Sequence, residues 1–226
     1  KLDVNTIIPD LLIFKKKYFL KDNKLIINKI RRKFKKKIII RSSAIDEDVE
    51  NNSNAGKYFS CISNLKPDDL LKNINKVCSF LKIDDYFIVQ IFISKPKLSG
   101  VIFTRCINDN APYIVINIDY SQKTNLITSG KYNPTMKTYY IHRSLKYVPL
   151  KFKKIVKLIS SLEKIIKHDR LDIEFAQKGK FTYLFQCRKL LFKKKTISLN
   201  SELINIEKKI IKIFKKEPGI FGKHNM

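Results

Sequence analysis

The chain has 226 residues, of which 44% are hydrophobic, and carries a formal net charge of +27 at pH 7. This apolar content excludes an intrinsically disordered protein, and the length suits one domain or two small lobes with a buried core. No apolar run approaches the roughly 20 residues that cross a bilayer. No secretory signal is visible either, which predicts a cytoplasmic protein without a membrane partner.

The positive charge has two interpretations. One is a surface for nucleic acid or anionic membranes. The other is compositional drift, in which Lys, Asn and Ile have replaced other residues throughout. Because the lysines are scattered along the whole chain, we favour drift and expect no nucleic-acid partner. A basic nucleic-acid-binding module is the alternative.

The cysteines predict neither a zinc site nor a disulfide framework. They form no C-x-x-C pair and lack the spacing of a zinc site. Nothing suggests export, so four reduced thiols are expected, and two disulfides are the alternative. The four residues are Cys61, Cys78, Cys106 and Cys187.

The first half of the chain predicts a mixture of helices and strands. Residues 25–34 have the spacing of a basic amphipathic helix, and residues 37–41 form a β-branched run typical of a short strand. A loop rich in Ser, Asn and acids follows over 42–56, and then a strand over 57–62. A clear helix begins at Pro67. Its apolar face consists of Leu70, Leu71, Ile74, Val77, Cys78 and Leu81.

Strands dominate the second half. A helix over 151–167 has an apolar stripe, two strands over 171–177 and 181–188 flank a turn at Gly179, and a last helix covers 201–214. Because runs of strands in hairpin order are interspersed with helices, we predict an α+β fold in two lobes with largely antiparallel sheets. Four further strands, rich in β-branched and aromatic residues, are predicted over 86–93, 100–105, 113–119 and 137–142.

A first candidate site segment runs from Ile38 to Ala44. A buried strand delivers Arg41 and the hydroxyls of Ser42 and Ser43 to its exposed end. Arginine offers a planar fork of donors that suits phosphate oxygens. The alternative is an arginine paired with a nearby acid, for which the candidates are Asp46, Glu47 and Asp48.

A second segment ends in the same way. The strand from Gly100 is followed by the hydroxyl of Thr104 and the guanidinium of Arg105. An ordinary strand end is the alternative. No P-loop and no dinucleotide-binding glycine fingerprint occurs in the chain, so a nucleotide would be bound by another device.

The third segment is a hairpin with a polar face. If the hairpin centres on Lys180, Glu174 faces Gln186 and Asp172 faces Arg188. Mg²⁺ prefers oxygen ligands, which Glu174 and Gln186 offer, and Arg188 could pair with Asp172 or contact phosphate. A solvent-facing hairpin is the alternative, and a one-residue shift of the turn would break the register. The opposite, apolar face would hold Ile173, Phe175, Phe185 and Cys187.

Together and in order, these segments resemble the nucleotide-binding domain of the phosphoenolpyruvate synthase and pyruvate phosphate dikinase family. The resemblance covers about residues 38 to 190. The matching motifs are Ile40-Arg41-Ser42-Ser43-Ala44, Asp46-Glu47-Asp48, Ala55-Gly56, Val89-Gln90, Ser99 to Thr104, Asp172-Ile173-Glu174 and Leu184-Phe185-Gln186-Cys187-Arg188.

Three further pieces are similar to a subgroup of that family that includes bacterial glutamine kinases. These enzymes phosphorylate the side-chain amide of glutamine for capsule decoration. The pieces are residues 111–117, Thr128-Ser129-Gly130 and Phe221-Gly222-Lys223.

The resemblance implies an ATP-grasp fold that closes on ATP and Mg²⁺, with one lobe over 1–93 and a second over 94–190. Residues 191–226 would form a basic linker and helix leading to further domains. A phosphoryl group would pass from ATP through a histidine on a mobile domain to an acceptor, glutamine or pyruvate, bound outside this chain. Among the matched positions, Arg41, Arg105 and Arg188 would be catalytic and Glu174 and Gln186 would bind the metal. The expected nucleotide-binding residues are Arg41, Ser42, Gln90, Phe92, Thr104, Arg105 and Asp172.

The sequence also departs from the family pattern. The glycine-rich N-terminal segment of the family is not recognisable, and residues 119–130 lack the glutamates of its E-x-x-x-G-E-x-x-V-x-G pattern. The phosphocarrier T-S-H motif is absent. None of the histidines lies in such a context, so we expect nucleotide binding without complete phosphoryl transfer. The histidines are His142, His168 and His224.

Overall fold

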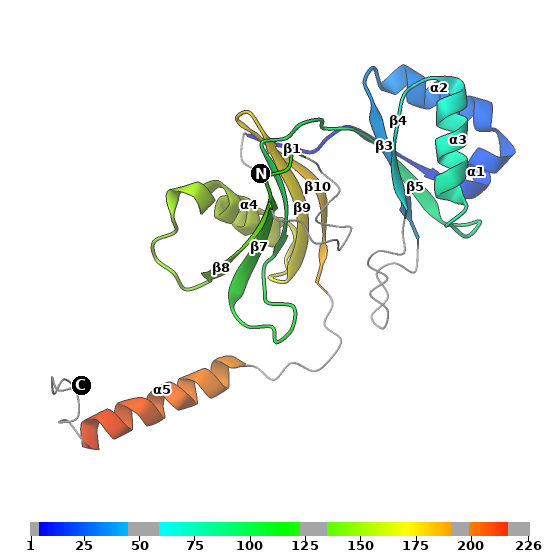
Figure 1. Cartoon of the computed structure of the whole chain (residues 1–226). Coiled ribbons are helices and arrows are strands. Elements are labelled where there is room, and N and C mark those ends of the chain that lie inside the picture. The colour runs from blue at the N-terminus through cyan, green and yellow to red at the C-terminus, as the bar shows by residue number, and fades with distance from the viewer. Residues whose placement is uncertain (1–4, 45–58, 123–134, 191–198, 217–226) are drawn as a thin grey trace.

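The computed structural model describes residues 5–44, 59–122, 135–190 and 199–216. Figure 1 shows two lobes, each built on a sheet with helices against one face. All strand pairs but one are antiparallel in the described residues. The predicted fold class, α+β in two lobes with largely antiparallel sheets, is therefore confirmed.

The small lobe is a four-stranded sheet in the order β2-β5-β3-β4, covered by α1, α2 and α3. Its core includes Ile30, Ile74 and Phe87, which are fully buried. The short apolar strand β2 and the lysine-rich helix α1 are not among the predicted elements. The elements are β2 (Leu11–Lys15), α1 (Lys16–Lys21), α2 (Asn23–Lys33), β3 (Ile38–Ser43), β4 (Ser60–Ser63), α3 (Pro67–Cys78) and β5 (Tyr86–Ile91).

The large lobe is a six-stranded sheet in the order β1-β10-β9-β6-β7-β8. Helix α4 packs onto one face, where Ile159 contributes to the same core as Ile102 and Ile173. Strand β1 lies parallel to β10 in this sheet, although the expected first lobe, 1–93, includes it. The elements are β1 (Thr6–Ile7), β6 (Leu98–Phe103), β7 (Tyr113–Asp119), β8 (Met136–His142), α4 (Leu150–Ile166), β9 (Leu171–Lys178) and β10 (Phe181–Lys189).

The hairpin of β9 and β10 has the predicted cross-strand pairs, but it reaches this register only because β10 contains a bulge that was not predicted. Glu174 lies opposite Gln186 and Asp172 opposite Arg188, as expected. The turn, however, is the two-residue Gly179-Lys180, so the register near it differs by one residue. A bulge between Leu184 and Gln186 restores the expected pairing.

The bulge corrects one prediction about the apolar face. Leu184, not Phe185, lies opposite Phe175 and joins the core. Phe185 has no residue opposite it, and its half-buried ring lies under the guanidinium of Arg41, with 5.9 Å from the Arg41 Cζ to the ring centroid. The predicted core position of Phe185 is wrong because strand alternation shifts by one residue at a bulge.

Two of the cysteines should be nearly unreactive in the native protein. Burial raises the pKa of Cys78 to about 11, and burial together with the charge of Asp172 raises the pKa of Cys187 to about 11. The thiolate is the reactive form, so both should react slowly with a thiol reagent at pH 8 and faster as the pH approaches 11. Mass spectrometry after timed labelling would measure this. Labelling in guanidinium chloride is the control, and equal native and denatured rates would contradict the prediction. The structure has Cys61, Cys78, Cys106 and Cys187 as free thiols.

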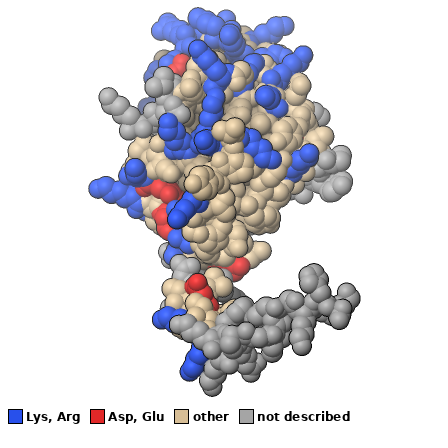
Figure 2. Space-filling model, turned by 90° about the vertical axis from the view of Figure 1, so that its left-hand side faces the viewer, with Lys and Arg blue, Asp and Glu red and all other residues tan. Residues whose placement is uncertain are grey.

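Helix α5 (Leu199–Lys216) lies apart from both sheets, below the large lobe in Figure 1. No helix in the described ranges has the length and apolar character to span a membrane. Figure 2 shows Lys and Arg side chains spread over much of one face of the molecule, with few acidic groups. Exposed lysines of α4 include Lys151, Lys153, Lys154 and Lys157.

Candidate site between the two lobes

An ion pair joins a predicted phosphate-binding residue of the small lobe to a predicted metal ligand of the large lobe. Arg41 lies in β3, and its Nη1 donates a hydrogen bond of 2.9 Å to Oε2 of Glu174 in β9. The two side chains are only 22% and 17% exposed, so solvent screens their attraction less than at an open surface. The face of β9 that carries Glu174 is therefore turned toward the small lobe, opposite α4.

Three further predicted residues surround Glu174 on the same hairpin. Gln186 lies directly across from it on β10. Asp172, two residues earlier on β9, accepts a hydrogen bond of 2.9 Å at Oδ2 from Nε of Arg188. The expected pairing of Arg188 with Asp172 is thus present. The polar face of the hairpin holds two carboxylates, an amide and one guanidinium, and Arg41 adds a second guanidinium from the small lobe.

This donor set suits an ion bound together with phosphate. In the described parts of the chain no group of three or more His, Cys, Asp and Glu side chains forms a metal cage. Mg²⁺ does not need one, because it is usually held by one or two protein oxygens plus waters and substrate phosphates. The Nε of Arg41 is buried and has no hydrogen-bond partner among the described residues.

The other predicted residues of the small lobe are mostly buried. Ser42 donates from its hydroxyl to the carbonyl of Phe59 at 3.2 Å and accepts from the Phe59 amide at 2.9 Å. Gln90 lies in the central strand β5 and is 2% exposed. Phe92 follows β5, half-buried, and its amide donates to the carbonyl of Lys37. The hydroxyl of Ser42 is therefore engaged in holding the chain that enters β4.

Thr104 and Arg105 lie beyond the end of β6, separate from the ion pair between the lobes. Thr104 is fully buried; its hydroxyl donates to the carbonyl of Asp169 and accepts from the amide of Leu171. Arg105 donates from Nη2 to Oδ2 of Asp169 at 2.7 Å. Both residues are thus engaged with the segment that leads into β9. The Nε of Arg105 is buried and has no hydrogen-bond partner among the described residues.

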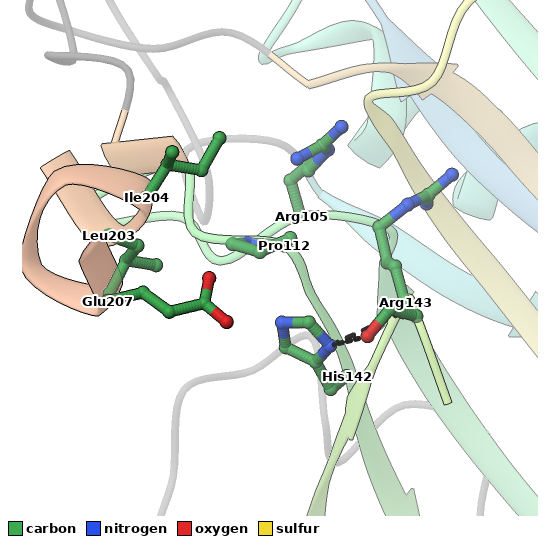
Figure 3. Close-up of a pocket in the computed structure, with 8 residues that line it drawn as sticks. Arg105, Pro112, His142, Arg143, Leu203, Ile204 and Glu207 are labelled. Carbon is green, nitrogen blue, oxygen red and sulfur yellow. Dashed lines mark hydrogen bonds between the residues drawn. The ribbon is translucent and has the colours of Figure 1, made fainter. Parts of the chain in front are cut away.

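A pocket of about 470 Å³ opens beside Arg105, between the large lobe and α5. Figure 3 shows the guanidiniums of Arg105 and Arg143 pointing away from the carboxylate of Glu207. The Nδ1 of His142 is 2.7 Å from the hydroxyl of Ser144. From α5 the pocket receives the apolar side chains of Leu203 and Ile204 and the carboxylate of Glu207. Its lining is Arg105, Pro112, His142, Arg143, Ser144, Leu203, Ile204 and Glu207.

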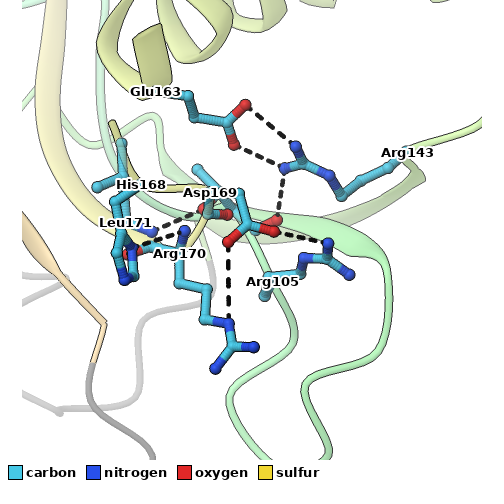
Figure 4. Close-up of polar contacts among 8 residues, drawn as sticks. Arg105, Arg143, Glu163, His168, Asp169, Arg170 and Leu171 are labelled. Carbon is cyan, nitrogen blue, oxygen red and sulfur yellow. Dashed lines mark hydrogen bonds and ion pairs between the residues drawn. The ribbon is translucent and has the colours of Figure 1, made fainter. Parts of the chain in front are cut away.

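Sequence reasoning missed the polar network behind this pocket, which Figure 4 shows. Arg143 binds Glu163 through two hydrogen bonds of 2.7 and 3.0 Å and also donates to the carbonyl of Thr104. These bonds to Glu163 raise the pKa of Arg143 although burial lowers it. Glu163 is the only acid in the sequence of α4, which is a signal for an internal partner.

Asp169 has a lowered pKa in the same network. Burial raises its pKa, but the hydrogen bond and charge of Arg105, with the charges of Arg170 and Arg143, outweigh that effect. The network therefore fixes the connections around β6 and β9 and holds Arg105 at the sheet end.

Several predicted pieces lie outside the described residues. They include the acidic stretch Asp46-Glu47-Asp48, Ala55-Gly56, Thr128-Ser129-Gly130, Phe221-Gly222-Lys223 and His224. In the described part of the chain Arg41 donates a hydrogen bond to Glu174; its alternative partners in the acidic stretch lie outside the described residues.

Comparisons with known proteins give a weak structural likeness. No family model matches this chain, and no curated protein matches its sequence. A D-alanine–D-alanine ligase from Bacillus anthracis aligns at 16% identity with a TM-score of 0.43, over 88% of this chain and 56% of that one. The ligase from Helicobacter pylori aligns at 10% identity and a TM-score of 0.42, over 82% of this chain and 47% of that one.

A third solved structure is a macrocyclase from Microcystis aeruginosa bound to its precursor peptide. It aligns at 10% identity with a TM-score of 0.37, over 80% of this chain and 46% of that one. The chain thus spans about half the length of the solved structures that it matches. Neither the identities nor the TM-scores support an inference about activity.

Proposed function

We propose that this chain is the ATP-binding part of an ATP-grasp phosphotransferase and binds Mg·ATP between its two lobes. The observation that carries the proposal is the 2.9 Å contact between Arg41 of the small lobe and Glu174 of the large lobe. It brings together two residues 133 positions apart in the sequence, both singled out by the family resemblance. A donor fork and a carboxylate at a lobe boundary are the groups that a metal-bound phosphate needs.

Each residue of the proposed site has a distinct task. Arg41 would bind phosphate oxygens with its planar fork. Glu174 and Gln186 would hold Mg²⁺, which when bound neutralises phosphate charge. Arg188 keeps the carboxylate of Asp172 oriented through its 2.9 Å hydrogen bond. Such sites act by positioning and charge neutralisation, so their residues need no unusual reactivity of their own.

The resemblance supports a finer proposal about the reaction. A phosphoryl group would pass from ATP to a histidine nitrogen on a separate domain and then to an acceptor. Glutamine is the favoured acceptor, as in glutamine kinases, and pyruvate is the alternative, as in phosphoenolpyruvate synthase.

Calorimetric titration of Mg·ATP into the full chain tests the proposal. We expect saturable binding that is lost when EDTA removes Mg²⁺ and that changes little between low and moderate ionic strength. Binding to phosphates by the surface lysines alone would instead fall steeply with salt and need no Mg²⁺. That second result, with equal binding of RNA, would overturn the proposal in favour of a basic nucleic-acid-binding module.

A further inference from the structure

The bulge in β10 gives one aromatic residue an unexpected position. Between the turn and Leu184 the strand follows one register, and from Gln186 onward it follows another. Phe185 stands at the change and has no partner on β9. Bulges commonly re-aim a side chain next to a functional site. Here the re-aimed side chain is turned from the core toward the small lobe.

The ring of Phe185 meets the guanidinium of Arg41. The Arg41 Cζ is 5.9 Å from the ring centroid, within the range in which a cation is attracted by an aromatic face. Arg41 is therefore held by two residues of the large lobe, by Phe185 through its ring and by Glu174 through a hydrogen bond of 2.9 Å. A guanidinium is planar, delocalised and weakly hydrated, so an aromatic contact restricts its orientation as well as attracting its charge.

We propose that Phe185 is a positioning residue that orients the guanidinium of Arg41 for phosphate binding. This inference rests on the function proposed for the site. A flexible arginine loses conformational freedom when it binds an anion, and an arginine already restricted by a ring loses less. Glu174 is proposed to turn to the metal when Mg·ATP binds, and its hydrogen bond to Arg41 would then be lost. Phe185 would remain as the contact that keeps Arg41 in place.

Three variants and one matched control test the role in nucleotide binding. Phe185→Leu should weaken Mg·ATP binding roughly tenfold in calorimetry, with a small change in the unfolding temperature. Phe185→Tyr keeps the aromatic face and should restore most of the affinity. In an Arg41→Lys background, Phe185→Leu should have little further effect, because a lysine has no plane to orient. Phe181→Leu, the same change at the turn end of β10, is the control and should bind as the wild type does.

A second readout needs no nucleotide and separates this inference from the proposed function. The ring should shift the Nε–Hε signal of Arg41 in the NMR spectrum of the ligand-free protein, assigned with Arg41→Lys. That shift should vanish in Phe185→Leu and persist in Phe181→Leu. If the shift is lost only in Phe185→Leu but the wild type does not bind Mg·ATP, the proposed function fails and the contact of Phe185 with Arg41 stands. Wild-type affinity in Phe185→Leu, or no change of the Arg41 signal, would overturn the positioning role.

Discussion

Replacing Glu174 with glutamine should weaken Mg·ATP binding about 100-fold, a larger effect than we expect for any other single change at the site. The substitution keeps the size of the side chain but removes the negative charge that would bind Mg²⁺. In the wild type Arg41 forms an ion pair of 2.9 Å with Glu174, and the substitution removes the charge of this partner. Calorimetric titration of Mg·ATP, with thermal unfolding measured in parallel, would separate lost affinity from lost folding.

The matched control is the same substitution in another arginine–glutamate pair, which lies within the large lobe. Glu163→Gln removes the charge that binds Arg143 through hydrogen bonds of 2.7 and 3.0 Å. Because both groups are largely buried, we expect a loss of about 1–2 kcal/mol in the free energy of unfolding. The affinity for Mg·ATP should not change. Equal weakening by both variants would mean that Glu174 acts through stability, and unchanged binding by Glu174→Gln would contradict its assignment to the metal.

Elements with strong periodicity were predictable from the sequence. The amphipathic helices α3 and α4 and the β-branched strand β7 lie close to their predicted ranges. The missed elements, β1, β2 and α1, are short, and packing against the rest of each lobe rather than a local pattern defines them. The bulge at Phe185 was not predictable, because Leu184 and Phe185 are both apolar and the sequence does not show which of them faces the core.

The individual residues of the candidate site were predictable from the sequence, but the contact between the two lobes was not. Arg41, Glu174 and Gln186 each stand in a recognisable motif, yet no local signal pairs Arg41 with a residue 133 positions away rather than with the nearby acids. The role of a hydroxyl at a strand end is also ambiguous in the sequence. A serine or threonine there can face a ligand or satisfy nearby backbone groups, and Ser42 and Thr104 both do the second.

Strand β6 requires a glycine at position 100 for a steric reason. A Cβ built at Gly100 would lie 2.6 Å from the backbone oxygen of Asn117 on β7 and 2.6 Å from Cε1 of Phe175 on β9. The oxygen cannot move without separating β6 from β7, and the ring is fully buried in the core. Gly100→Ala should therefore lower the free energy of unfolding by about 3 kcal/mol.

Urea denaturation would measure this loss, and Gly179→Ala provides the matched control. Gly179 has a φ of 59° and nothing within 4 Å of an added Cβ, so alanine there meets only the backbone cost of the left-handed region, about 1 kcal/mol. A loss at Gly100 no greater than that at Gly179 would mean that β6 and β7 can separate easily. The close approach of the two strands would then not be what requires glycine, and the site face of β9, which pairs with β6 at Gly100 and Phe175, would be less rigid than we infer.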